Sequence, residues 1–75
     1  MNLNELAETL NKMYSNASEG DQVANIHLFG VKYADHILRN NYKATEIVRR
    51  SGIKPSYATE LSKGIKLSKY VTPKV

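Results

Sequence analysis

The apolar positions near the start of the chain recur at intervals of three and four residues, as they do along one face of a helix. These positions are Leu3, Leu6, Leu10 and Met13. Asn2 stands before them as a capping residue, and Glu5, three residues later, completes a capping box. The pattern predicts an amphipathic helix of about twelve residues, followed by a loop at residues 15–18.

A second run at helical spacing follows and predicts a longer helix from Asp21 to about Asn40. Ser18 and Asp21 form a second candidate capping pair at its start. The positions at helical spacing, which we expect to face inward, are Val23, Ile26, Phe29 or Gly30, Tyr33, Ile37 and Leu38. Gly30 lies in the middle, where it costs about 1 kcal/mol relative to alanine. We expect that close approach of the first helix requires this glycine.

Two shorter helices are predicted next, separated by a tight turn. The first covers residues 44–51, and Gly52 stands where a left-handed residue ends a helix. Pro55 suits the first position of the second helix, because its missing N–H has no partner there. Gly64 is the expected stop. The inward side chains across the two helices are Ile47, Val48, Ile53, Ala58 and Leu61.

The last eleven residues, 65–75, show only a short apolar–polar alternation and predict an extended or weakly helical arm. The whole pattern predicts an all-α domain over residues 1–75, with four helices and with or without a short fifth. A helix-turn-helix is expected at about residues 44–64. Because a chain of 75 residues buries only about 60% of its unfolded surface, its core is expected to be thin.

The chain has no cysteine, so neither a disulfide nor a thiolate metal site is available. No stretch reaches the roughly 18 apolar residues of a membrane span. The first ten residues carry two acids and no base, unlike a secretory signal. We therefore expect a cytoplasmic protein, associated with the nucleoid if it is bacterial or from a phage.

Charge divides the chain into two unlike halves. Residues 1–42 hold three basic and five acidic side chains, a net charge of −2, whereas residues 43–75 hold eight basic and two acidic ones, a net charge of +6. A basic half favours a polyanionic partner. A basic tail that only aids solubility is the alternative interpretation.

A short helix, a glycine turn and a second helix with a polar outer face together describe a helix-turn-helix. The run from Ser51 to Gly64, SGIKPSYATELSKG, resembles the motif of the Cro and phage-repressor family, and residues 46–50 resemble its preceding helix. Three features depart from that family. Val48 replaces the usual alanine, two helices precede the motif instead of one, and only eleven residues follow it.

This resemblance implies that the second motif helix enters the major groove of double-stranded DNA. The residues expected to read bases are Lys54, Ser56, Tyr57, Thr59 and Glu60. The residues expected to contact phosphates, because of their charge or polarity around the motif, are Lys43, Thr45, Arg49, Arg50, Lys63, Lys66 and Lys69.

Each of these assignments has a structural alternative. Tyr57 suits the core with its hydroxyl group at the rim, and Glu60 suits an exposed pair with Lys63 as well as it suits a cytosine amino group. For Arg49 and Arg50, a solvated helix surface is the alternative to phosphate contact.

The sequence offers no catalytic, metal or cofactor constellation. His27 and His36 are nine residues apart, about 180° around a helix, so they cannot share a metal ion. The five tyrosines lack clustered arginine and histidine partners, and no phosphate-binding glycine loop is present. We expect a protein that is not an enzyme and that uses no cofactor or small-molecule ligand.

Two functions fit these observations. The first is sequence-specific DNA binding, as a transcriptional regulator or as the DNA-reading domain of a larger protein, with a homodimer as a plausible form. The second is a protein-interaction adaptor on a helix-turn-helix scaffold, with the apolar stripe of the first helix as its docking surface.

Overall fold

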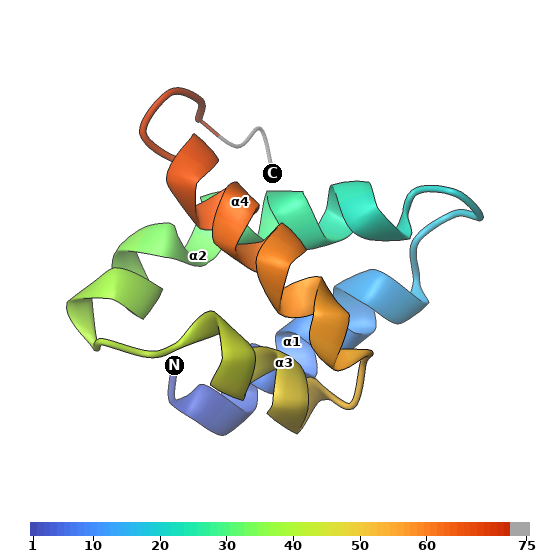
Figure 1. Ribbon diagram of the computed structural model, residues 1–75, viewed down its shortest axis with the longest axis horizontal. Helices are drawn as coiled ribbons and strands as arrows, with labels where there is room; N and C mark the ends of the chain where they lie inside the picture. The colour runs from blue at the N-terminus through green and yellow to red at the C-terminus, as the bar shows by residue number, and fades with distance from the viewer. Residues whose placement is uncertain (73–75) are drawn as a thin grey trace.

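The computed structural model describes residues 1–72, and within them four α-helices and one 3₁₀ turn form the domain (Figure 1). The elements are α1 (Leu3–Ser15), α2 (Gln22–Arg39), α3 (Ala44–Ser51), η1 (Pro55–Tyr57) and α4 (Ala58–Leu67). The predicted all-α class and the four helices are confirmed. The 3₁₀ turn η1 is a fifth, short helical element, and it directly precedes α4.

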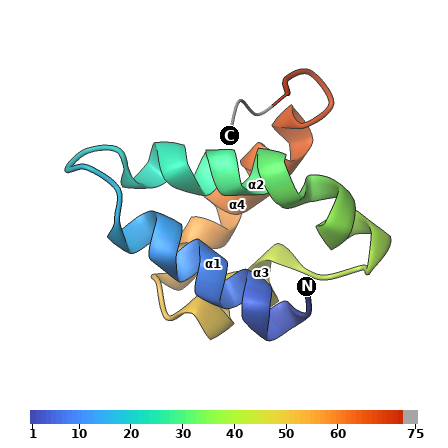
Figure 2. The same ribbon diagram turned by 180° about the vertical axis from the view of Figure 1, so that it is seen from behind.

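The helices pack as two crossed pairs. α4 lies across α2 and α1 packs against α3; seen from behind, α1 and α2 lie in front of α3 and α4 (Figure 2). Between the pairs lies one core to which all four helices contribute. Its fully buried large side chains are Leu6, Leu10, Ile26, Phe29, Ile37, Ile47, Val48 and Leu61.

The capping box of α1 is confirmed. The Glu5 N–H donates to Asn2 Oδ1 at 2.8 Å, and the Asn2 N–H donates to Glu5 Oε1 at 2.9 Å. The apolar stripe that follows turns inward, with Leu6 and Leu10 at 0% exposure. Because the domain's own core covers these side chains, they do not form the docking surface that the adaptor hypothesis requires.

The predicted cap of α2 and two of its predicted inward positions are wrong. Asp21 is the residue before the helix, but its side chain accepts no capping hydrogen bond; instead the Gly20 N–H donates to Gln22 Oε1 at 3.1 Å. Val23 and Leu38 were both expected to face inward, but they are 37% and 57% exposed. Ile37, the neighbour of Leu38, takes the core position, and the next residue of a helix points about 100° away.

Gly30 and Gly64 lie where α2 and α4 cross. The sequence predicts instead that Gly30 admits the first helix and that Gly64 ends its own helix. A Cβ at Gly30 would lie 2.8 Å from the backbone nitrogen of Ile65, and one at Gly64 would lie 2.5 Å from the carbonyl oxygen of His27. Gly30 therefore admits α4 rather than α1. Gly64 does not end its helix, because α4 continues through it to Leu67.

The predicted C-terminal arm is partly helical. Ile65, Lys66 and Leu67 form the last residues of α4, and a turn follows through Tyr70. The Ser68 hydroxyl donates to the Ile65 carbonyl at 2.6 Å and satisfies one of the last carbonyls of the helix. The remainder of the predicted arm, residues 73–75, lies outside the described residues. None of the helices described for residues 1–72 has the length and apolar character of a membrane span.

Candidate nucleic-acid interface

α3 and α4 are joined by the sharp reversal that a helix-turn-helix requires. α3 ends at Gly52, whose φ of +84° lies in the left-handed region that glycine adopts without a steric penalty. The Ser51 hydroxyl donates to the Val48 carbonyl at 2.6 Å and accepts from the Ile53 N–H at 3.3 Å. These contacts and the burial of Ile53 fix the turn against the core.

The second motif helix begins with a tighter turn than predicted. Pro55 occupies the first position of η1, as expected of a residue without an N–H, and the α-helical part starts three residues later at Ala58. The Tyr57 N–H donates to the Lys54 carbonyl at 3.0 Å. The predicted helical start at Pro55 is therefore correct in position, although its first turn is 3₁₀.

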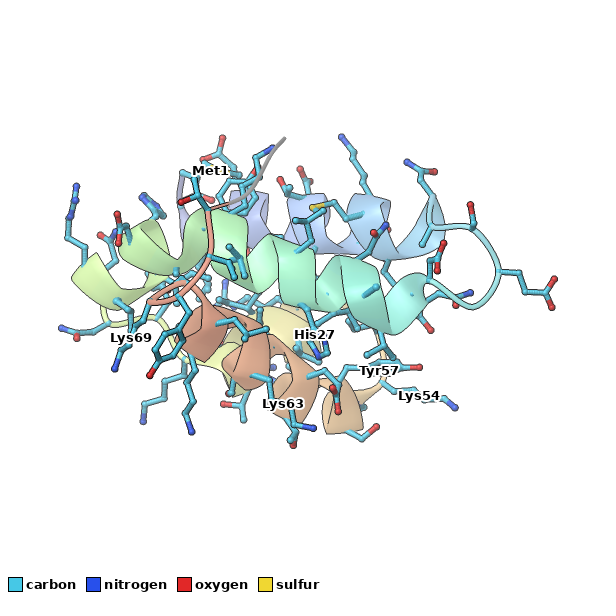
Figure 3. The ribbon with its side chains drawn as sticks, turned by 90° about the horizontal axis from the view of Figure 1, so that it is seen from above. Met1, His27, Lys54, Tyr57, Lys63 and Lys69 are labelled. Carbon is cyan, nitrogen blue, oxygen red and sulfur yellow. The ribbon has the colours of Figure 1, made fainter. Side chains whose placement is uncertain are left out.

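One face of this second helix is polar and open to solvent. Ser56, Thr59, Lys63 and Lys66 are exposed and are spaced by three or four residues, so they share one side of the helix. Leu61 and Gly64, on the opposite side, are buried. Lys54 is exposed at the start of the same segment, and Figure 3 shows it, with Lys63 and Lys69, on the side of the molecule that carries α4.

Tyr57 faces the interior of the domain rather than this open face. Its ring is half-buried and lies 5.4 Å from the ring of Tyr14 in α1, and the Tyr14 hydroxyl donates to the Tyr57 hydroxyl at 3.4 Å. This hydrogen bond raises the pKa of Tyr14. The packing favours the core alternative for Tyr57 over base reading, and it anchors the start of the motif helix to α1.

Glu60 is held by two neighbours at the edge of the polar face. Its Oε1 lies 2.8 Å from His27 Nε2 of α2, and its Oε2 accepts from Lys63 Nζ at 3.4 Å. The hydrogen bond from His27 is the main cause that lowers the pKa of the Glu60 carboxyl group, with Lys63 contributing. The alternative of a pair with Lys63 is thus present in the structure, together with a histidine contact that nothing in the sequence indicates.

Arg49 and Arg50 are both paired with Glu46 on α3. Arg49 Nη2 lies 2.5 Å and Arg50 Nε 3.0 Å from Glu46 Oε1. Arg50 Nη1 also donates to Asn4 Oδ1 of α1 at 2.8 Å. The hydrogen bond with Arg49 lowers the pKa of the Glu46 carboxyl group most strongly. Both arginines are exposed, but a phosphate contact has to compete with Glu46.

The remaining predicted phosphate contacts are solvent-accessible. Lys43 precedes α3, Thr45 lies in its first turn, and Lys69 follows α4. All three are exposed, as are Lys63 and Lys66. Lys63 is paired with Glu60, whereas Lys43, Lys66 and Lys69 form no ion pair within residues 1–72.

Comparison with known families gives one finding. A family described as an HTH-like domain matches residues 2–74. The chain belongs to this family. Comparison with curated proteins and with solved structures gives no match. Membership in a helix-turn-helix-like family suggests DNA as the ligand in general.

The extent of the HTH-like domain explains one departure from the Cro and phage-repressor pattern. The match begins before α1 and extends beyond α4, so the two helices that precede the motif are part of the domain itself. The finer resemblance to Cro and phage repressors stays a prediction.

The two histidines have separate surroundings in the HTH-like domain. His27 contacts Glu60, whereas His36 Nε2 contacts the carbonyl oxygen of Met1. Within residues 1–72 the structure brings no three histidine or carboxylate side chains together in the way that a metal ion requires.

Proposed function

We propose that this HTH-like domain binds double-stranded DNA in a sequence-specific manner, with the helix formed by η1 and α4 lying in the major groove. The observation that carries the proposal is the exposed polar face of that helix, with Ser56, Thr59 and Lys63 on one side and the core on the other. A helix in the major groove reads base edges with side chains near its N-terminus. Ser56 and Thr59 occupy those positions, and Lys54 adds a donor beside them.

The cations around this face supply the attraction to phosphates. Lys43, Lys63, Lys66 and Lys69 are exposed on or beside α3 and α4, and Thr45 adds a hydroxyl group. Phosphate contacts position a protein on the duplex without reading its sequence. Arg49 and Arg50 join them only when they exchange Glu46 for a phosphate oxygen.

We propose a regulator of transcription, or the DNA-reading domain of a larger protein, that is not an enzyme and that acts in the cytoplasm or at the nucleoid. A single module of this size contacts little DNA, so binding as a two-fold dimer to two half-sites would strengthen it.

A duplex titration at several salt concentrations tests the proposal. If about four cations neutralise phosphates, log affinity falls with log salt with a slope of about −4. Selection of bound duplexes from a random pool should then yield a consensus sequence. The absence of salt-dependent binding to any duplex would overturn the proposal, and binding without any consensus would reduce it to non-specific DNA binding.

A further inference from the structure

His27 belongs to α2, outside the helix-turn-helix, yet it touches the motif helix directly. Its Nε2 lies 2.8 Å from Glu60 Oε1, and the two side chains are 31% and 25% exposed. Figure 3 shows His27 on the same side of the molecule as Lys63. The contact therefore lies next to the face proposed to meet DNA, and not in the interior.

The glycine crossing explains why His27 can reach α4. A Cβ at Gly64 would lie 2.9 Å from His27 Cα, so the backbones of α2 and α4 meet at these two residues. Glu60 is one turn before Gly64 on the same helix, which places its carboxylate beside the imidazole ring. An ionised carboxylate only accepts hydrogen bonds, so the ring must carry its proton on Nε2 in this contact.

Glu60 keeps accepting capacity after both contacts. A carboxylate offers about four lone-pair sites, and His27 and Lys63 use one on each oxygen. The two donors also offset the repulsion that a lone carboxylate would meet near phosphates. A carboxylate that is fixed in direction and partly neutralised is suited to accept from the N4 amino group of cytosine in the major groove.

We propose that His27 is a positioning residue for base reading, because it holds the Glu60 carboxylate at the edge of the motif helix for contact with cytosine N4. This inference rests on the proposed DNA-binding function. It extends the reading surface beyond the helix-turn-helix to α2. Without His27, Glu60 is free to rotate or to pair with Lys63 alone, and a base contact requires a side chain held within about 0.5 Å of its place.

Duplex selection with a set of variants tests this role. The unmodified domain should prefer a cytosine at one position of its site by about tenfold over thymine. Glu60→Gln and His27→Leu should each reduce that preference to below about twofold. His27→Gln, whose side-chain amide can donate from a similar position, should restore it.

His36→Leu serves as the matched control, because His36 is on α2 but contacts the Met1 carbonyl instead of α4; it should keep the preference. Thermal melting of each variant shows whether the domain is folded. A folded His27→Leu or Glu60→Gln variant that still prefers cytosine at that position would overturn the inference while leaving DNA binding intact. If the unmodified domain binds no duplex, the proposed function fails and the inference fails with it.

Discussion

Glu46 controls how much of the positive charge of α3 is available to a ligand. Its carboxylate accepts hydrogen bonds from Arg49 and Arg50 together, and these bonds lower the pKa of Glu46. All three side chains are at least about a third exposed, so the pairs contribute little to stability. Their main consequence concerns the proposed binding, because each arginine would have to exchange a carboxylate for a phosphate.

Replacing this carboxylate should therefore strengthen binding to DNA. In Glu46→Gln the arginines lose their competitor, and we expect affinity for any duplex to rise by roughly threefold or more, with a steeper salt dependence. Fluorescence anisotropy with a labelled duplex measures both. An affinity that is unchanged or lower would show that Arg49 and Arg50 do not face the phosphates.

The hydrogen-bonded carboxylates of Glu46 and Glu60 should also make the stability of the domain depend on pH. The pKa values of Glu46 and Glu60 in the folded domain are lowered from 4.5. The stability that they contribute is therefore present above the unfolded pKa and is lost as pH falls through the folded pKa. The melting temperature should decrease below about pH 4.5. The double variant Glu46→Gln/Glu60→Gln should show a smaller decrease, and an identical decrease would contradict this source of acid sensitivity.

At the scale of the elements, the crossing of α2 and α4 fixes the orientation of the proposed reading helix. Gly30 and Gly64 remove side chains where the two backbones meet, and the buried Leu61 continues the contact into the core. α4 therefore rests on α2 by its buried side and leaves the opposite side open.

Gly64→Ala tests this crossing, because close contact between the helices reverses the sign of its effect on the free energy of unfolding. In an exposed helix the change would stabilise by about 1 kcal/mol. Here the added Cβ would lie 2.5 Å from the His27 carbonyl oxygen, so the helices must separate, and we expect a net loss of about 1–3 kcal/mol. Urea unfolding measures the difference. A variant as stable as the unmodified domain would show that the two helices are not in close contact.

The motif was predictable from the sequence because its signals are local. Gly52 and Pro55 mark the turn within four residues, and the Asn2–Glu5 box marks the start of α1. The pairing of His27 with Glu60 joins residues 33 apart in the sequence and depends on how α2 and α4 cross. Periodicity along one helix contains no information about that partner.

The roles of Gly30 and Gly64 also depend on contacts between helices that the sequence does not show. The sequence marks Gly30 as unusual inside a helical pattern and predicts Gly64 as the end of a helix, but a glycine that ends a helix and one that admits a neighbouring helix look alike in a single sequence. Only the packing distinguishes them. Ile37 and Leu38 are likewise adjacent apolar residues at the end of α2, and the apolar pattern alone does not show that Ile37 takes the core position and leaves Leu38 exposed.

At the scale of the whole molecule, the basic and acidic halves of the sequence form different helices. The basic half of the chain forms the motif and the acidic half forms α1 and α2, with net charges of +6 and −2. α1 lies on the opposite side from α4 (Figure 3). A polyanion should therefore be attracted to the motif side, while the α1 side contributes little.

Mapping the DNA contact surface by NMR is the most direct test of the central claim, that the exposed face of the motif helix meets DNA. Backbone amide signals would be followed while a selected duplex is added to the domain. The account predicts that the largest shifts occur at residues 54–66 and near Lys43, with small shifts across residues 5–12 of α1. Shifts concentrated on α1, with Ser56, Thr59 and Lys63 unaffected, would contradict it.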